Sequence, residues 1–293
     1  MLLRRFFTNH GIKLFDVTMR DGLQSVKTMI PLEEKKAMVE RLLKHRRPDS
    51  LEIGSLVSAK AMPQMATSID LFKHTDEFIR QSTDLNTRLF MLVPPRFDRM
   101  CQAHELGVRN VSVMSSVSDD FQLKNVRQTT SQTISTITNS LRLLTFDSAK
   151  VYLSCVNECP VAKRKYATHH IADVVVEYAK IPQVSEICLS DTMGTLRWVT
   201  LREILEEARA SGVLMDKISL HLHISGDDIY NMASLICMAT SMGVTRIDVS
   251  DVGTGGCNMT LDEGQLHGNL TYEILEDCIW RHKSLGDFWY GRV

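Results

Sequence analysis

Residues 185–223 read SEICLSDTMGTLRWVTLREILEEARASGVLMDKISLHLH and contain two short apolar runs separated by a helical pattern. The runs are Ser185–Ser190 and Lys217–His223, and their near-continuous apolar character is typical of strands buried on both faces. Between them, apolar side chains recur at the i, i+3, i+4, i+7 spacing of one helix face: Leu201, Ile204, Leu205 and Ala208. Because neighbouring parallel strands need a crossover helix, this stretch predicts two parallel strands joined by a helix.

The same alternation extends over the rest of the chain. Six further candidate strands are Lys13–Thr18, Ser50–Gly54, Arg88–Leu92, Asn110–Met114, Lys150–Cys155 and Thr245–Val249. Eight strands, each followed by a helical segment, predict a closed (β/α)8 TIM barrel, because closure removes the exposed sheet edges. An open doubly wound sheet is the alternative, but no GxGxxG or GxxxxGK[ST] motif follows any strand. We expect one catalytic domain over residues 1–293, with an N-terminal tail at 1–12 and a C-terminal helical segment at 270–293.

Composition excludes several classes of protein. The 293 residues are 44% apolar and 24% charged, which argues against a disordered chain. The 34 basic and 35 acidic residues give a net charge of −1, unlike a dedicated nucleic-acid or polybasic membrane binder. Seven cysteines without a CxxC pair suggest free thiols in a reducing compartment. We therefore expect a cytoplasmic protein, with a mitochondrial location as the alternative because Met1–Gly11 is basic and lacks acids.

Polar residues gather where the predicted strands end, which in a barrel is the catalytic face. The first strand leads into Asp16–Gln24, DVTMRDGLQ, whose adjacent Arg20 and Asp21 could also form a simple surface ion pair. Glu52 lies within the second strand and needs a partner, because an unpaired buried charge is very costly. Asp191 follows the sixth strand.

The strongest local pattern is His221-Leu-His223 on the seventh strand. Residues i and i+2 of a strand point to the same face, so the two imidazoles would converge. A single histidine there is usually only a hydrogen-bonding group, but two beside Asp21 suggest ligands of one divalent cation. With Asn269 they offer two oxygen and two nitrogen donors, which suits Mg²⁺ or Mn²⁺. Zinc would prefer a tetrahedral site rich in sulfur or histidine.

The segment after the eighth strand is rich in glycine. Residues 253–268 hold five of the fifteen glycines of the chain, which predicts a mobile loop acting as a lid. A phosphate-binding loop is the other interpretation, but no lysine follows the glycines. Cys257 lies among these glycines and is a candidate proton donor or acceptor, whereas the other six cysteines are ordinary buried thiols. Glu273 follows Asn269 by one helical turn.

Together these motifs resemble the 3-hydroxy-3-methylglutaryl-CoA lyase family of the DRE-TIM metallolyase superfamily. The resemblance extends from about Lys13 to Glu276. It rests on the motifs Asp16–Gln24 with Lys27, Ser55–Gln64, Ser154–Pro160, Asp191–Gly194 and Gly255–Cys257. The sequence departs from the family pattern just after His223 and just after Cys257.

The resemblance implies cleavage of 3-hydroxy-3-methylglutaryl-CoA into acetoacetate and acetyl-CoA by a homodimer that takes an acyl-CoA substrate. The implied ligands of Mg²⁺ or Mn²⁺ are Asp21, His221, His223 and Asn269. The other implied roles are stabilisation of negative charge by Arg20, proton removal by Asp191 or His221, protonation of the enolate by Cys257, orientation by Glu52 and Glu273, and substrate or supporting contacts by Gln24 and Lys27. Two alternatives stay open: a Claisen-type synthase that joins an acyl-CoA to a 2-oxo acid, and a catalytically impaired barrel used for binding.

Overall fold

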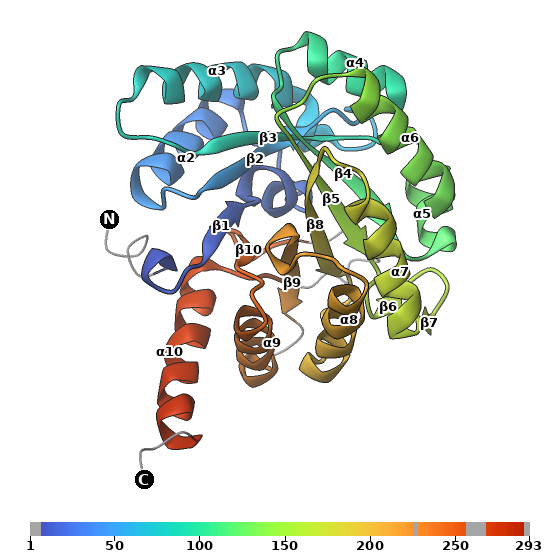
Figure 1. The fold of residues 1–293 in the computed structure, drawn as a ribbon. Helices are drawn as coiled ribbons and strands as arrows, with labels where there is room; N and C mark the ends of the chain where they lie inside the picture. Colours follow the sequence, from blue (N-terminus) through green and yellow to red (C-terminus); the bar gives the residue numbers. More distant parts are fainter. Residues whose placement is uncertain (1–6, 225–227, 256–267, 290–293) are drawn as a thin grey trace.

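The computed structural model describes residues 7–224, 228–255 and 268–289. Eight parallel strands form its centre (Figure 1): β1 (Lys13–Asp16), β2 (Ser50–Ser55), β3 (Arg88–Val93), β4 (Asn110–Ser116), β5 (Ser148–Ser154), β8 (Val184–Asp191), β9 (Ile218–Ile224) and β10 (Arg246–Val249). β10 pairs in parallel with both β9 and β1, so the sheet closes on itself. The predicted TIM barrel is therefore confirmed, and the open doubly wound sheet is excluded.

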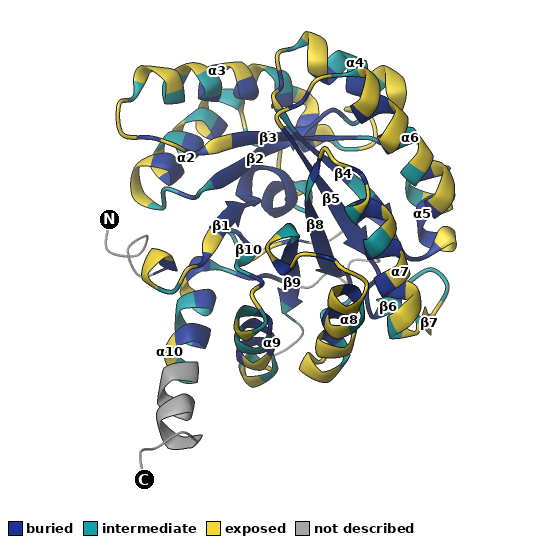
Figure 2. Ribbon diagram, viewed as in Figure 1, coloured by how far each residue is buried: buried dark blue, intermediate teal, exposed yellow. Residues whose placement is uncertain are grey.

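Helices cover the outside of this barrel. They are α2 (Leu32–His45), α3 (Ser68–Gln81), α4 (Phe97–Glu105), α5 (Asp119–Val126), α6 (Thr130–Leu143), α7 (Thr168–Ala179), α8 (Trp198–Ala210), α9 (Ile229–Ser241) and α10 (Tyr272–Trp289). Figure 2 shows buried strands inside and helices whose outer faces are exposed. The predicted α8 stripe is buried at all four positions: Leu201, Ile204, Leu205 and Ala208. In the described part of the chain, no helix has the length and apolar character needed to cross a bilayer.

Two short pairings decorate the C-terminal ends of the strands. β6 (Glu158–Cys159) and β7 (Arg164–Lys165) form a small antiparallel hairpin after β5. β11 (Gly268–Asn269) pairs antiparallel with the end of β9. The predicted mobile loop and Cys257 lie mostly outside the described residues, which omit 256–267. The predicted N-terminal tail is described from Phe7, whose side chain is fully buried in the core.

The barrel interior is separate from the main hydrophobic core. The main core lies between the strands and the helices, whereas two small apolar clusters, centred on Phe15 and Tyr152, are distinct from it. Along β5, Lys150 and Tyr152 alternate with the core residues Val151 and Leu153. Because successive strand residues face opposite sides, Lys150 and Tyr152 point into the barrel.

Candidate metal centre and active site

A π-helical turn, Thr18–Gly22, ends the first strand and positions its two charged residues. Thr18 is held from both sides, since its amide donates to Asp16 Oδ1 at 2.8 Å and its hydroxyl accepts from the Asp251 amide at 2.8 Å. A Cβ atom at Gly22 would lie 2.4 Å from Val252 Cγ2. Only glycine therefore lets this turn pack against the segment that follows β10. The packing leaves Arg20 and Asp21 buried at the mouth of the barrel.

The two oxygens of Asp21 have different surroundings. Oδ1 accepts from Arg20 Nη1 at 2.5 Å and from Gln24 Nε2 at 2.7 Å. Oδ2 faces the Nε2 atoms of His221 and His223, at 3.9 and 3.8 Å. Burial alone would raise the pKa of Asp21, but Arg20 and the two imidazoles outweigh it and hold that pKa well below its usual range. Asp21 is therefore a carboxylate with one oxygen directed at the histidine pair.

The histidines converge as the HxH spacing predicts. Their Nε2 atoms lie 3.0 Å apart, and both side chains are buried. His221 Nδ1 lies 3.2 Å from Asp248 Oδ2. Burial would raise the pKa of Asp248, but Lys150 and His221 lower it, so Asp248 is ionised and can only accept. Nδ1 of His221 therefore carries the proton, and its Nε2 presents a lone pair to the cluster.

Asn269 joins this cluster through the pairing of β11 with β9, in which it lies directly opposite His223. Residues opposite one another in an antiparallel pair project to the same side of the sheet. The Asn269 amide nitrogen donates to the Thr254 carbonyl at 3.0 Å, while its buried Oδ1 has no hydrogen-bond partner among the described residues. A buried oxygen without a partner is costly unless a ligand satisfies it.

These four donors fit a divalent cation. The ligand atoms of Asp21, His221 and His223 all lie within 4.8 Å of one another. Adjacent ligands of an octahedral ion with bonds of about 2.1 Å lie about 3 Å apart, which is close to the separation of the two imidazole nitrogens. The unsatisfied Asn269 oxygen completes a set of two oxygens and two nitrogens. This set holds the oxygen and nitrogen donors of a divalent-cation site, and it lacks the sulfur donors that structural zinc sites commonly use.

Arg20 is held next to the cluster by two carboxylates. Its Nε donates to Glu52 Oε2 at 2.5 Å, and its guanidinium lies 5.1 Å from the centre of the Tyr152 ring. Glu52, fully buried, also accepts from Ser112 and from the Tyr152 hydroxyl at 3.2 Å. The sequence predicts that Glu52 needs a charged partner, and that partner is Arg20.

Three other predicted site residues are placed differently. Asp191 lies beside His223 along a small pocket, but its oxygens accept from the amides of Thr195 and Leu196 at 3.2 and 2.9 Å. Glu273 is 61% exposed and pairs with Arg46 at 2.5 Å, so its carboxylate faces away from the cluster. Lys27 is exposed, with no part in lining the main cavity. The structure therefore gathers seven predicted residues: Arg20, Asp21, Gln24, Glu52, His221, His223 and Asn269.

A buried ion-pair network behind His221 was not predicted from the sequence. Lys150 Nζ lies 2.5 Å from Asp248 Oδ1 and 2.9 Å from Glu186 Oε1, and all three side chains are at most 3% exposed. The network extends the chain of contacts from His221 through Asp248 to Lys150. The sequence could have indicated this network, because Lys150 begins the apolar run 150–155 and a charge in a buried strand requires a partner.

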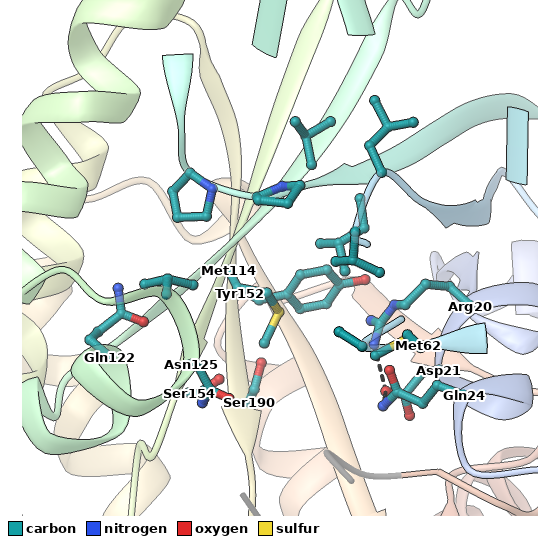
Figure 3. Close-up of a pocket in the computed structure, with 18 of the residues that line it drawn as sticks. Arg20, Asp21, Gln24, Met62, Met114, Gln122, Asn125, Tyr152, Ser154 and Ser190 are labelled. Carbon is teal, nitrogen blue, oxygen red and sulfur yellow. Dashed lines mark hydrogen bonds and ion pairs between the residues drawn. The ribbon is translucent and has the colours of Figure 1, made fainter. Parts of the chain in front are cut away.

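The cluster lies at one end of a cavity of about 360 Å³. Figure 3 shows Arg20, Asp21 and Gln24 at one end, with Met114 and Tyr152 in the middle and Gln122 at the other end. Apolar side chains contribute most of the walls, including Leu56, Val57, Met62, Leu92, Val93, Pro94, Pro95, Phe121 and Val126. The cavity thus joins the polar cluster to mainly apolar walls, as small-molecule sites commonly do.

The chain is similar to several known proteins. The mitochondrial hydroxymethylglutaryl-CoA lyase of Arabidopsis thaliana is 29% identical over 278 residues, which are 94% of this chain and 55% of that protein. The chain thus spans about half the length of that relative. The 3-hydroxy-3-isohexenylglutaryl-CoA/hydroxy-methylglutaryl-CoA lyase of Pseudomonas aeruginosa is 29% identical over 249 residues, 84% of this chain and 78% of that protein.

A solved hydroxymethylglutaryl-CoA lyase from Pseudomonas aeruginosa superposes with a TM-score of 0.75 at 26% identity, covering 94% of this chain and 85% of that one. The carboxyl transferase domain of Rhizobium etli pyruvate carboxylase, 18% identical over 87% of this chain and 44% of that one, shares the fold at a TM-score of 0.59. The family model described as HMGL-like matches residues 11–275. Because that match takes in nearly the whole barrel together with the cluster of Asp21, His221 and His223, the protein belongs to the HMGL-like family.

Proposed function

We propose that the protein is a divalent-metal-dependent carbon–carbon lyase that cleaves 3-hydroxy-3-methylglutaryl-CoA into acetoacetate and acetyl-CoA. The observation that carries the proposal is the convergence of Asp21, His221 and His223 beside Arg20 at one end of a largely apolar cavity. The names of the relatives from Arabidopsis and Pseudomonas support the same chemistry.

The residues that would hold the cation are Asp21, His221, His223 and Asn269. When bound, Mg²⁺ or Mn²⁺ would supply Lewis-acid polarisation of a chelating hydroxyl and carboxylate. The protein supplies the orientation of the ligands. Arg20 and Gln24 fix Asp21, and Asp248 fixes the ring of His221.

Arg20 is suited to stabilise negative charge that develops as the bond breaks. Glu52 and Asp21 hold its guanidinium from two sides, so little reorganisation is needed during reaction. A fixed donor of this kind is typically worth about 3–4 kcal/mol in the transition state. Arg20 lines the cavity wall, so it would lie beside a substrate bound there.

Two residues are candidates for the base that removes the hydroxyl proton. His221 lines the cavity and is oriented by Asp248. Asp191 lies beside His223 instead, and burial raises its pKa, which would favour proton uptake. Because the cation would occupy Nε2 of His221 and its Nδ1 already carries the proton directed at Asp248, Asp191 is the stronger candidate. The pH profile of kcat/KM in Asp191→Asn tests the choice. Cys257 stays the proposed donor of the proton to the enolate carbon.

The substituent on the hydroxyl-bearing carbon of the substrate can be tested by comparing two substrates. The Pseudomonas relative is named for both an isohexenyl and a methyl substituent at the same carbon. Leu92, Met114 and Phe121 give the cavity apolar walls that favour a hydrocarbon group. The methyl and isohexenyl substrates should therefore both be assayed.

The decisive experiment follows acetoacetate release from 3-hydroxy-3-methylglutaryl-CoA with Mg²⁺ or Mn²⁺. We expect activity that EDTA abolishes and that His223→Ala loses. His74→Ala is a matched control, because His74 lies on α3 and contacts Glu40 rather than the cluster. Absence of product with both acyl substrates, or product that is insensitive to EDTA, would overturn the proposal.

A further inference from the structure

Three arginines lie along the same cavity as the candidate metal centre. Arg96 and Arg99 flank the start of α4, and Arg127 directly follows α5. All three line the cavity, yet none belongs to the cluster of Asp21, His221 and His223. They form a group that we call the arginine rim.

The arginine rim carries a net positive charge. Arg96 contacts Asp98 through two bonds of 3.0 Å, and Arg99 lies 3.9 Å from the same carboxylate. Arg127 makes no ion pair with any residue that the structure describes. Among the described ion pairs, Asp98 is the only carboxylate that contacts the arginine rim, and it contacts Arg96 and Arg99 but not Arg127. One negative charge therefore faces three positive ones.

No carboxylate of the cavity wall offsets this charge. Among the described lining residues, Asp21 is the only carboxylate, and its Oδ1 already accepts from Arg20 and Gln24. A cavity with a positive rim and apolar walls attracts anions and concentrates them at its mouth.

The backbone of Arg127 supports a functional reason for this side chain. Arg127 caps α5 in the left-handed conformation, with φ of 58°, and its amide donates to the Leu123 carbonyl. Glycine is preferred at such a position, because a side chain there costs about 1 kcal/mol. A strained position occupied by an unpaired arginine at a cavity is the kind of outlier that points to ligand binding.

We infer that Arg96, Arg99 and Arg127 bind the phosphate groups of the substrate's coenzyme A portion. The inference rests on the proposed function, since that function supplies an acyl-CoA. The lining of the cavity offers the three kinds of surface that such a substrate needs. The cluster suits the chelating acyl end, the apolar walls suit the uncharged pantetheine arm, and the arginine rim suits the phosphates. Guanidinium groups match phosphate oxygens because they donate two parallel hydrogen bonds.

The test compares thioesters with and without phosphates. Steady-state kinetics of Arg127→Ala are measured with 3-hydroxy-3-methylglutaryl-CoA and with the corresponding pantetheine thioester, which lacks the nucleotide. We expect KM for the CoA substrate to rise about tenfold, the size of one charge-assisted hydrogen bond, with kcat unchanged. KM for the pantetheine thioester should not change. The dephospho-CoA thioester separates the 3′-phosphate from the pyrophosphate.

Lys124→Ala is the matched control, because Lys124 is an exposed cation of α5 that does not line the cavity. It should leave both KM values unchanged. Equal rises of KM for both thioesters in Arg127→Ala would assign the arginine to the acyl carboxylate and overturn the phosphate assignment. An unchanged KM for the CoA substrate in Arg96→Ala, Arg99→Ala and Arg127→Ala would overturn it as well.

A binding measurement keeps this inference separate from the proposed lyase activity. The Kd of free coenzyme A is measured by calorimetry for the wild type, Arg127→Ala and Lys124→Ala. Weaker binding in Arg127→Ala alone supports the arginine rim even when no acyl substrate is cleaved. Equal Kd values in all three proteins overturn it even when the lyase activity is present.

Discussion

Asp248 offers a direct test of how the metal cluster is built. It contacts no predicted ligand other than His221, whose Nδ1 lies 3.2 Å away, and it receives Lys150 at 2.5 Å on its other oxygen. Asp248→Asn keeps the size of the side chain but introduces an amide that can donate to Nδ1. The proton of the imidazole then moves to Nε2, the atom that faces Asp21 and His223.

We expect Asp248→Asn to bind Mn²⁺ about 10–100-fold more weakly, because partners that orient metal-ligating histidines typically contribute that much to affinity. This corresponds to about 1.4–2.7 kcal/mol of binding free energy. The Kd is measured from the electron paramagnetic resonance signal of free Mn²⁺, and circular dichroism confirms that the variant is folded.

Asp251→Asn is the matched control for this prediction. Asp251 lies two residues after β10, is 35% exposed and pairs with Arg46 instead of a histidine. Its substitution should leave the Kd for Mn²⁺ unchanged. A folded Asp248→Asn protein whose Kd stays within about twofold of the wild type would refute the role assigned to Asp248.

Three further predictions concern stability. Lys150→Met leaves Asp248 and Glu186 without their shared cation, so urea denaturation should show a loss of about 3–5 kcal/mol of unfolding free energy; a loss below about 1 kcal/mol would contradict the buried network. Burial raises the pKa of Asp16 from 3.8 to about 7, although the Tyr272 hydroxyl donates to this carboxyl group. Between these two pH values the folded state therefore binds a proton that the unfolded state does not. The free energy of unfolding should accordingly fall as pH rises from about 4 to about 7. Asp16→Asn should remove that part of the slope, and an unchanged slope would count against it. Mn²⁺ at about 100 times its Kd should add about 2.7 kcal/mol of stability in thermal melts, an increase that EDTA reverses.

The barrel could be predicted because its strands and helices have different periodicities. Apolar runs such as Ser185–Ser190 are buried on both faces, and the stripe containing Leu201 and Leu205 is buried on one. The first strand ends at Asp16 rather than at the predicted Thr18, because the π-helical turn begins at Thr18. Local pattern does not anticipate such a turn, which depends on Gly22 packing against Val252 and Ser250.

The cluster could be predicted in part. His221 and His223 share a face by strand geometry alone, and Asp21 follows from the rule that strand ends meet at one rim. The partners of Lys150 could not be predicted, because they come from β8 and β10, and the facing side chains are known only once the barrel closes. The exposed position of Glu273 depends likewise on Arg46, a residue from the far end of the chain.

The pairing of β11 with β9 has a consequence for how the protein becomes active. Asp21 lies in the turn that follows β1, and Asn269 lies opposite His223 through β11, which follows β10 in the chain. No contiguous half of the chain contains the whole ligand set. The cluster is therefore complete only when the barrel has closed, and an ion bound there would link residues near the two ends of the chain. The affinity for a metal ion should accordingly report whether β10 has paired with β1 and β9, whereas helix content measures only local structure.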